Sequence, residues 1–190
     1  MLNRIIVTIL FILFITLGVS GQYPFYKEYW EELADRSKII VVGTAEEGYL
    51  VGRPEKLILS SDNPNPTDRD IYVGRVFRIR ITKTLKGKIK TEKVGENKYA
   101  NVFLYWISGV PSMSEPIILT GEEYVLFLNP NNDKELEGKS TIEFNKTNYD
   151  IIAKPFDYKS SYLVVDNFRG GAVEIGTDKK KLIKEIKEAL

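Results

Sequence analysis

The side chains available for chemistry in this 190-residue chain are mainly carboxylates, because the sequence has 26 Asp and Glu but no Cys and no His. Without His, the chain lacks the usual general base near neutral pH and the commonest transition-metal ligand. Without Cys, it has no thiolate nucleophile, no disulfide and no Cys-ligated metal. The sequence therefore excludes Ser-His-Asp, Cys-His and His-zinc chemistry. Carboxylate catalysis, lysine chemistry and oxygen-ligated cations remain open.

A secreted, carboxylate-based hydrolase, acting for instance on glycans, is the enzymatic hypothesis that remains. It needs two acids about 5–10 Å apart around a cleft. The candidate acids beside predicted strands are Glu122, Glu123, Asp157, Asp166 and Glu174. Nothing in the spacing pairs any two of them. We therefore assign no catalytic residue, and we expect no cofactor-binding or metal-ligating residue.

Residues 60–70 (SSDNPNPTDRD) concentrate oxygen atoms of the kind that Ca²⁺ prefers. The candidate ligands are Asp62, Asn63, Asn65, Asp68 and Asp70. Their spacing does not match an EF-hand loop, which has Gly at the sixth position and Glu at the twelfth. We interpret the segment as a solvated loop.

A basic stripe lies within the clearest predicted strand, residues 71–85 (IYVGRVFRIRITKTL). Apolar and polar residues alternate there with period two, which is typical of a half-buried strand. The basic residues are Arg75, Arg78, Arg80 and Lys83. They could meet an acidic ligand, but we predict that acids on the neighbouring strands balance them.

Most of the remaining elements are also predicted strands. They cover residues 38–44, 101–107, 124–128, 141–144, 151–156, 161–165 and 172–175, with a short one at 57–59. The last two full strands look like a hairpin or a strand-turn-strand unit. Residues 46–70, 88–98, 108–118 and 129–139 are predicted loops, the last of them mobile.

Two helices are predicted to flank the strands. Residues 23–36 place aromatic side chains at helical spacing. Residues 179–190 form the second, with Thr177 as its cap and Asp178 at its positive end. Its apolar face is predicted to contain Leu182, Ile183, Ile186 and Leu190.

The N-terminus has the order of a secretory signal peptide. Arg4 precedes an apolar run at 5–17, and small residues follow at 18–21. A membrane-spanning helix needs about 20 apolar residues, and this run is shorter. We predict cleavage near Gly21, which leaves 22–190 as a single domain that is secreted or retained in the cell envelope. The alternative is an uncleaved membrane anchor.

Charge excludes one class of partner. Residues 1–21 contain one base and no acid, so the remaining chain is electrically neutral. Nucleic acid calls for a basic face. We therefore expect no nucleic acid as partner, and contact with a membrane only through an uncleaved N-terminal segment.

Three segments occur in a telling order: 33–44 (LADRSKIIVVGT), 77–87 (FRIRITKTLKG) and 119–128 (LTGEEYVLFL). In this the chain resembles exported bacterial proteins related to tissue inhibitors of metalloproteinases and netrin-like modules. The resemblance implies an OB-like closed antiparallel barrel of about five strands with an N-terminal and a C-terminal flanking helix. It also implies that Gly121 makes the turn into the last of these segments.

The resemblance does not extend to inhibition. The animal inhibitors chelate the protease zinc through an N-terminal Cys held by disulfides, and this chain has no Cys. We therefore expect an exported, non-enzymatic module that binds a protein or another extracellular ligand. Its contact surface is predicted in the loops at 46–70, 88–98 and 108–118. The candidate aromatic anchors are Tyr49, Tyr105 and Trp106, although Trp106 also suits the core.

Overall fold

The computed structural model describes residues 27–53, 72–105, 118–144, 151–165, 171–176 and 178–190. Several predicted features lie outside the described residues. They are the export segment, the strand at 57–59, the oxygen-rich loop at 60–70, Trp106, Asp166 and Thr177.

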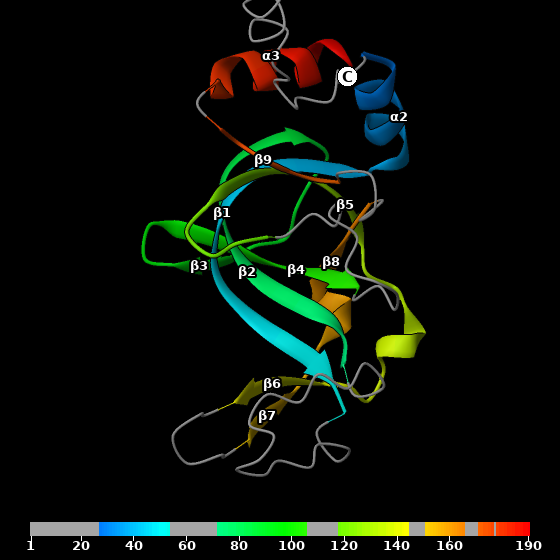
Figure 1. The fold of residues 1–190 in the computed structure, drawn as a ribbon, viewed down its shortest axis with the longest axis vertical. Coiled ribbons are helices and arrows are strands. Elements are labelled where there is room, and N and C mark those ends of the chain that lie inside the picture. The colour runs from blue at the N-terminus through cyan, green and yellow to red at the C-terminus, as the bar shows by residue number, and fades with distance from the viewer. Residues whose placement is uncertain (1–26, 54–71, 106–117, 145–150, 166–170, 177) are drawn as a thin grey trace, which may run out of the picture.

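The described part of the chain is mainly β, as predicted (Figure 1). Its strands are β1 (Ile39–Gly52), β2 (Tyr72–Lys86), β3 (Glu92–Val94), β4 (Asn97–Tyr105), β5 (Glu123–Pro130), β6 (Ser140–Phe144), β7 (Ile151–Pro155), β8 (Ser161–Val164) and β9 (Ala172–Glu174). Its helices are α2 (Lys27–Arg36) and α3 (Lys179–Glu188), with 3₁₀ turns η2 (Lys134–Leu136) and η3 (Tyr158–Ser160).

Five strands pair in a closed ring in the order β1, β2, β4, β8, β5 and back to β1. All pairs are antiparallel except β4 with β8, which is parallel. The prediction of a wholly antiparallel ring is wrong at this pair. A closed ring with an odd number of strands cannot reverse direction at every step, so one parallel pair is required.

The first strand is longer than predicted. β1 continues past Thr44 to Gly52, so the loop expected from residue 46 begins later. Its first half pairs with β5 and its last three residues pair with β6. Shifts in register against β2, one of them between Ala45 and Glu47, break the period-two pattern. The interrupted pattern is why the sequence alone ends this strand too early.

Two predicted loops are also structured. Residues 92–105 form a hairpin of β3 and β4 that turns at Gly95, where φ is 60°. All three β3 residues are exposed, so no apolar pattern marked the strand. The segment 129–139, predicted to be mobile, buries Asn131, Leu136 and Lys139. Asp133 caps η2 there by accepting a hydrogen bond from the N–H of Glu135 at 2.9 Å.

The two late strands do not form a hairpin with each other. Both pair with β5, β8 along residues 128–130 and β9 along residues 124–126. The other edge of β5 is occupied by β1. The prediction of a turn before β5 is confirmed, since Gly121 adopts a φ of 95° just ahead of this strand.

Three clusters of buried side chains hold the fold together. The cluster inside the ring includes Val41, Ile79, Val102, Leu126 and Leu128. A second cluster lies under the two helices and includes Trp30, Leu33, Ile40, Phe127 and Ile186. The third comprises Val51, Val76, Phe103, Leu136, Phe156 and Tyr158. Strands β1, β2 and β4 therefore bury side chains on both faces along part of their length.

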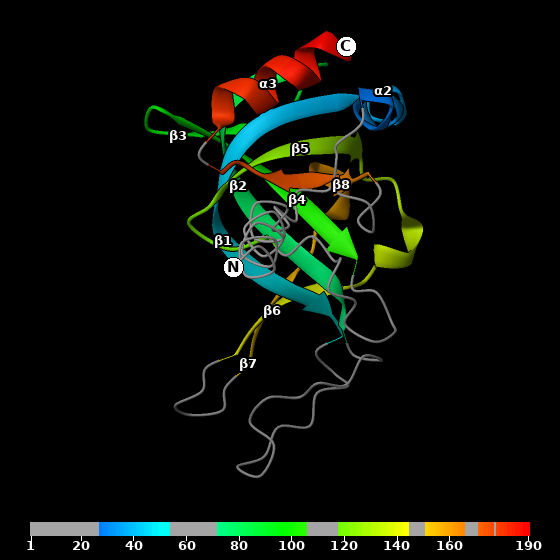
Figure 2. The same cartoon turned by 45° about the horizontal axis from the view of Figure 1, so that its top comes forward.

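Helices α2 and α3 cover one end of the ring (Figure 2). Trp30 of α2 is 1% exposed and stacks on Phe127 of β5 at 5.8 Å between ring centroids. On α3, Ile186 is buried as predicted, but Leu190 is 51% exposed because it follows the end of the helix. Within the described ranges, neither helix has the length and apolar character needed to cross a membrane.

Candidate functional site

A groove of about 300 Å³ lies where β6 and β7 cross the outer face of the ring. We call the antiparallel β6–β7 pair the ribbon. The ring side of the groove is lined by Tyr49, Val76, Arg78 and Asn101, and the ribbon side by Thr141, Glu143, Ile152 and Lys154. Thr141 pairs with Lys154 and Glu143 with Ile152, so the four ribbon side chains share one face. The groove is thus a space between two sheet faces.

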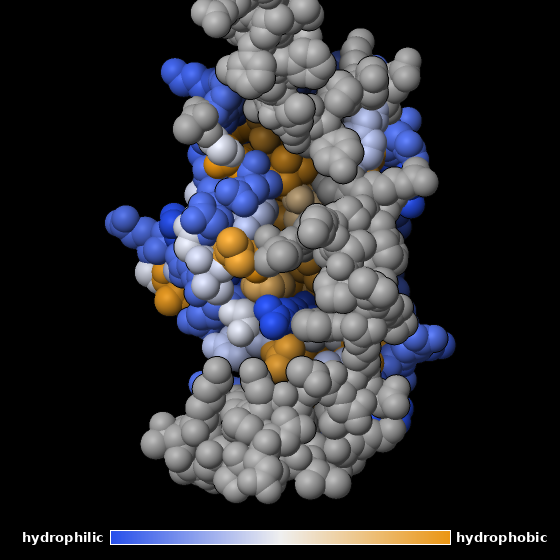
Figure 3. All heavy atoms as spheres, viewed as in Figure 1, coloured by the Kyte–Doolittle hydropathy of each residue, from blue (hydrophilic) through white to orange (hydrophobic). Residues whose placement is uncertain are grey.

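The groove continues along β4. A second hollow of about 360 Å³ is lined by Lys90, Glu92 and Tyr99, and it shares Asn101 and Ser160 with the groove. The surface around it is polar. In Figure 3, hydrophilic residues lie along the sides of the described surface, with apolar residues between them.

Two of the four basic residues in the β2 stripe, Arg78 and Arg80, pair with acids, as the solvated-face interpretation predicts. Arg78 forms an ion pair with Glu92 of β3 at 3.4 Å, and its guanidinium lies 4.4 Å from the centre of the Tyr99 ring. Arg80 forms an ion pair with Glu46 of β1 at 2.6 Å. These two arginines therefore have little charge left for an acidic ligand.

Three charged residues in the groove, unlike these arginines, have no ion-pair partner among the described residues. The side chains of Glu143, Lys154 and Asp157 form no ion pair or hydrogen bond with any other described residue. Both signs of charge are therefore available to a ligand within one groove.

Tyr49, a predicted anchor, lies on the ring side of the groove. Its hydroxyl donates a hydrogen bond to Glu47 Oε2 at 2.8 Å. This bond, then burial, then the negative charges of Glu47 and Glu143 raise the pKa of Tyr49 above its ordinary value. The phenol is therefore protonated at neutral pH.

Phe156 lines the groove and belongs to an aromatic cluster, which we call the floor. The Phe103 ring packs edge-on against Tyr105 at 5.0 Å and tilted against Phe156 at 5.6 Å between centroids. The Tyr105 hydroxyl donates a hydrogen bond to Asp133 Oδ2. Burial, followed by this hydrogen bond, raises the pKa of Tyr105 far above its ordinary value. Tyr105 thus supports the floor and does not line the groove, unlike the contact predicted for it.

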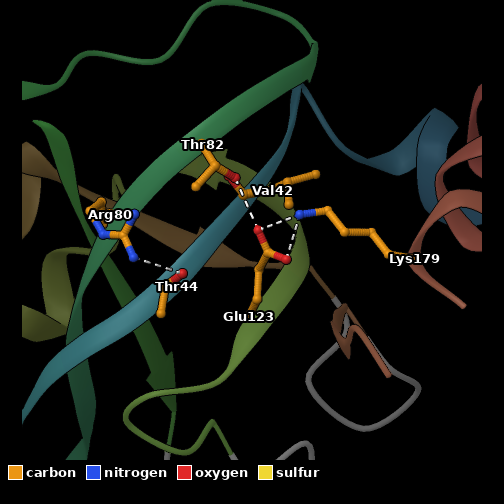
Figure 4. A network of polar contacts seen from close by, with 6 residues as sticks. All are labelled: Val42, Thr44, Arg80, Thr82, Glu123 and Lys179. Atoms are coloured by element: carbon orange, nitrogen blue, oxygen red, sulfur yellow. Dashed lines mark hydrogen bonds and ion pairs between the residues drawn. The ribbon is translucent and has the colours of Figure 1, made fainter. Parts of the chain in front are cut away.

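A separate polar network fastens α3 to the ring (Figure 4). Lys179 Nζ lies 2.8 Å and 2.6 Å from the two carboxylate oxygens of Glu123. The Thr82 hydroxyl lies 3.2 Å from Glu123 Oε1 and 3.1 Å from the carbonyl oxygen of Val42. Glu123 is therefore engaged in holding three strands and a helix together.

The predicted acids that the structure describes do not share one groove. Glu122 is exposed in the turn before β5, and Glu174 lies opposite Tyr124 in the β5–β9 pair. Of the predicted acids, Asp157 lines the groove, next to Glu143, which the sequence did not single out. Among the residues that the structure describes, no group of three or more acids is placed to hold a metal ion.

Among the described residues of the loops predicted as the contact surface, only Tyr49 lines the groove. Residues 46–52 are part of β1, residues 92–98 belong to the β3–β4 hairpin, and 54–70 and 108–117 lie outside the described residues. The groove depends instead on the ribbon, which the sequence identified only as two strands. A signal for it existed, since each ribbon strand carries one charged residue, Glu143 in β6 and Lys154 in β7.

No protein-family model matches the chain, and no curated protein matches it. The resemblance to inhibitor-like and netrin-like modules therefore stays a prediction.

Proposed function

We propose that this protein is an exported, non-enzymatic binding module whose groove holds an extended segment of a partner protein. The observation that carries the proposal is the groove between β2, β4 and the ribbon, with charges of both signs that no described residue neutralises. Such a surface suits a polypeptide, which offers acids, bases and apolar groups together. Nucleic acid is disfavoured, because it needs an excess of accessible bases.

We further propose that the ring is an OB-like barrel. This fold is supported by the five ring strands and the one parallel pair among them. It is also supported by the two helices, one before the first strand and one after the last. OB folds bind ligands on the face of their second and third strands and on adjoining loops. In this chain those strands are β2 and β4, which form the ring side of the groove.

The export segment is the second part of the proposal. We expect the mature protein to begin near residue 22. Intact-mass and N-terminal sequencing of the protein recovered from outside the cytoplasm test this. A chain that still begins at Met1 would instead support the anchored alternative.

One observation favours the carboxylate-based hydrolase as a second candidate. Glu143 and Asp157 line the same groove from different elements. If they act together, a panel of glycan and ester substrates shows turnover that Glu143→Gln and Asp157→Asn each abolish. No turnover by the wild-type chain retires this candidate.

Binding is tested with a random dodecapeptide library displayed on phage and selected on the full chain in mild detergent. Selected peptides are labelled, and their affinities are measured by fluorescence anisotropy. Asn101→Trp fills the middle of the groove and should weaken binding at least tenfold. Thr84→Trp places the same side chain at an exposed β2 position outside the groove and should leave binding unchanged. Equal affinities for both variants would refute the groove as the binding site.

A further inference from the structure

We infer that the bound segment adds to the free edge of β7 as an antiparallel strand, with an acidic residue opposite Lys154 and an apolar residue opposite Ile152. This inference rests on the proposed function and specifies how the groove recognises its ligand. It follows from the backbone of β7 and from the two side chains that β7 turns toward the groove.

Among the described residues, the backbone of β7 is paired along one edge, with β6, and has no partner along the other. β7 is the last strand of the sheet, and β6 is the one described strand that pairs with it. Phe156 donates its N–H to the carbonyl oxygen of Lys139 at 2.9 Å. Hydrogen-bonded pairs alternate along an antiparallel ladder, so the next ones are Thr141 with Lys154 and Glu143 with Ile152.

Ala153 therefore directs its N–H and C=O away from β6. Pro155, which has no N–H, also occupies a position that does not bond to β6. A peptide strand beside β7 would exchange two backbone hydrogen bonds with Ala153. This is the hydrogen-bonding pattern of strand addition to an exposed sheet edge.

The side chains flanking Ala153 set the sequence preference. Ile152 is 47% exposed and Lys154 has no ion-pair partner among the described side chains, and both line the groove. In an added antiparallel strand, the residues on either side of the one opposite Ala153 lie across from Lys154 and Ile152. Read from its N-terminus, the segment then carries an acid, any residue, and an apolar residue. Glu143 lies one strand further away, on β6.

The other edge strands are less suited to this role. β3 has three residues, two of them the charged Glu92 and Lys93, and β9 has three residues ending in Glu174. Short, charged edges resist strand addition. β7 has five residues and one charge.

The test removes a single backbone donor. Ala153→Pro deletes the outward N–H and leaves the ladder with β6 intact, which is the placement that a sheet edge tolerates for proline. We expect the library-selected peptides to bind this variant about tenfold more weakly than wild type. Ala153→Ser keeps the N–H and should bind as wild type does. Lys154→Glu should reverse the selected charge from acid to base.

The outcomes separate this inference from the proposed function. If Asn101→Trp weakens binding while Ala153→Pro and Lys154→Glu do not, the groove stands and strand addition is wrong. If Asn101→Trp binds normally, the proposed function itself fails. Should Ala153→Pro prove unfolded by circular dichroism, N-methylation of each peptide amide is scanned against the wild-type chain. The inference is supported if N-methylation of the amide facing Ala153 abolishes binding while N-methylation of its two neighbours does not. If binding survives N-methylation at every position, the inference is overturned.

Discussion

The two ends of the ring differ in the burial and the ion pairing of their side chains. At the end covered by α2 and α3, Trp30 and Ile186 are buried, and Lys179 is paired with Glu123 (Figure 1). At the ribbon end, Ile152 is half exposed, and Glu143 and Lys154 have no charged partner in the described part of the chain. Charged groups without partners contribute little to stability, so the contrast supports the proposal that the helix end stabilises the fold and the ribbon end binds the ligand.

Truncating the helix end should have the largest effect on stability. Trp30→Ala removes a fully buried ring stacked on Phe127 and should lower the free energy of unfolding by about 3–5 kcal/mol. Ile152→Ala at the ribbon end should change it by no more than about 0.5 kcal/mol, because the side chain is half exposed. Both changes are measured by urea denaturation, with unfolding monitored by far-UV circular dichroism because this signal does not depend on Trp30. Equal losses would erase the distinction between the two ends.

Strand β2 is sensitive to added volume where Gly74 pairs with β4. At Gly74 of β2, a Cβ atom would lie 2.2 Å from the carbonyl oxygen of Leu104 and 2.6 Å from the Phe103 ring. Gly74→Ala should therefore destabilise the fold by about 1–3 kcal/mol, the usual penalty for overpacking. Gly176→Ala, where a Cβ meets nothing within 4 Å, is the matched control and should be close to neutral. A neutral Gly74→Ala would mean that β2 and β4 are further apart than described.

The link between α3 and the ring should contribute less. The side chains of Lys179 and Glu123 are 47% and 24% exposed, so solvent screens the pair. A double-mutant cycle with Lys179→Met and Glu123→Gln should give a coupling energy of about 0.5–1 kcal/mol that falls with added salt. The same cycle on Lys184 and Glu188, a pair 3.6 Å apart and both more than half exposed, should give less. A larger coupling for the second pair would contradict the role given to the network.

A smaller effect on folding stability is expected at alkaline pH, from Tyr105 in the floor of the groove. The pKa of Tyr105 is raised by burial and by its bond to Asp133, so the folded state favours the neutral phenol. The stability that this provides is complete below the unfolded pKa of about 10 and is lost as pH rises above it. Tyr105→Phe should flatten the decline in stability above that pH, as measured by urea midpoints. An unchanged decline would show that Tyr105 titrates normally.

Local sequence patterns predicted the strands with a regular alternation of apolar and polar residues or a continuous apolar run. The alternation in β2 and the apolar run in β5 identified both strands, and the balance of Arg78 and Arg80 by neighbouring acids followed from cross-strand pairing. The bulged half of β1 and the wholly exposed β3 were missed, because neither shows a period of two.

The groove could not be predicted from the sequence for a different reason. It exists because β6 pairs with the far end of β1 and so brings Glu143 and Lys154 across from Arg78 and Asn101. These residues are tens of positions apart in the chain, and no local pattern encodes how the ribbon crosses the ring. The resemblance to a family did not extend to the ribbon, since its three segments lie within residues 33–128.

The most direct test of the division between the two ends is a chemical-shift map. Amide spectra of the ¹⁵N-labelled full chain are recorded while a library-selected peptide is added. We predict shifts concentrated in β7, β6 and the facing residues of β2 and β4, with α2 and α3 unchanged. Shifts centred on the two helices, with the ribbon silent, would contradict the account.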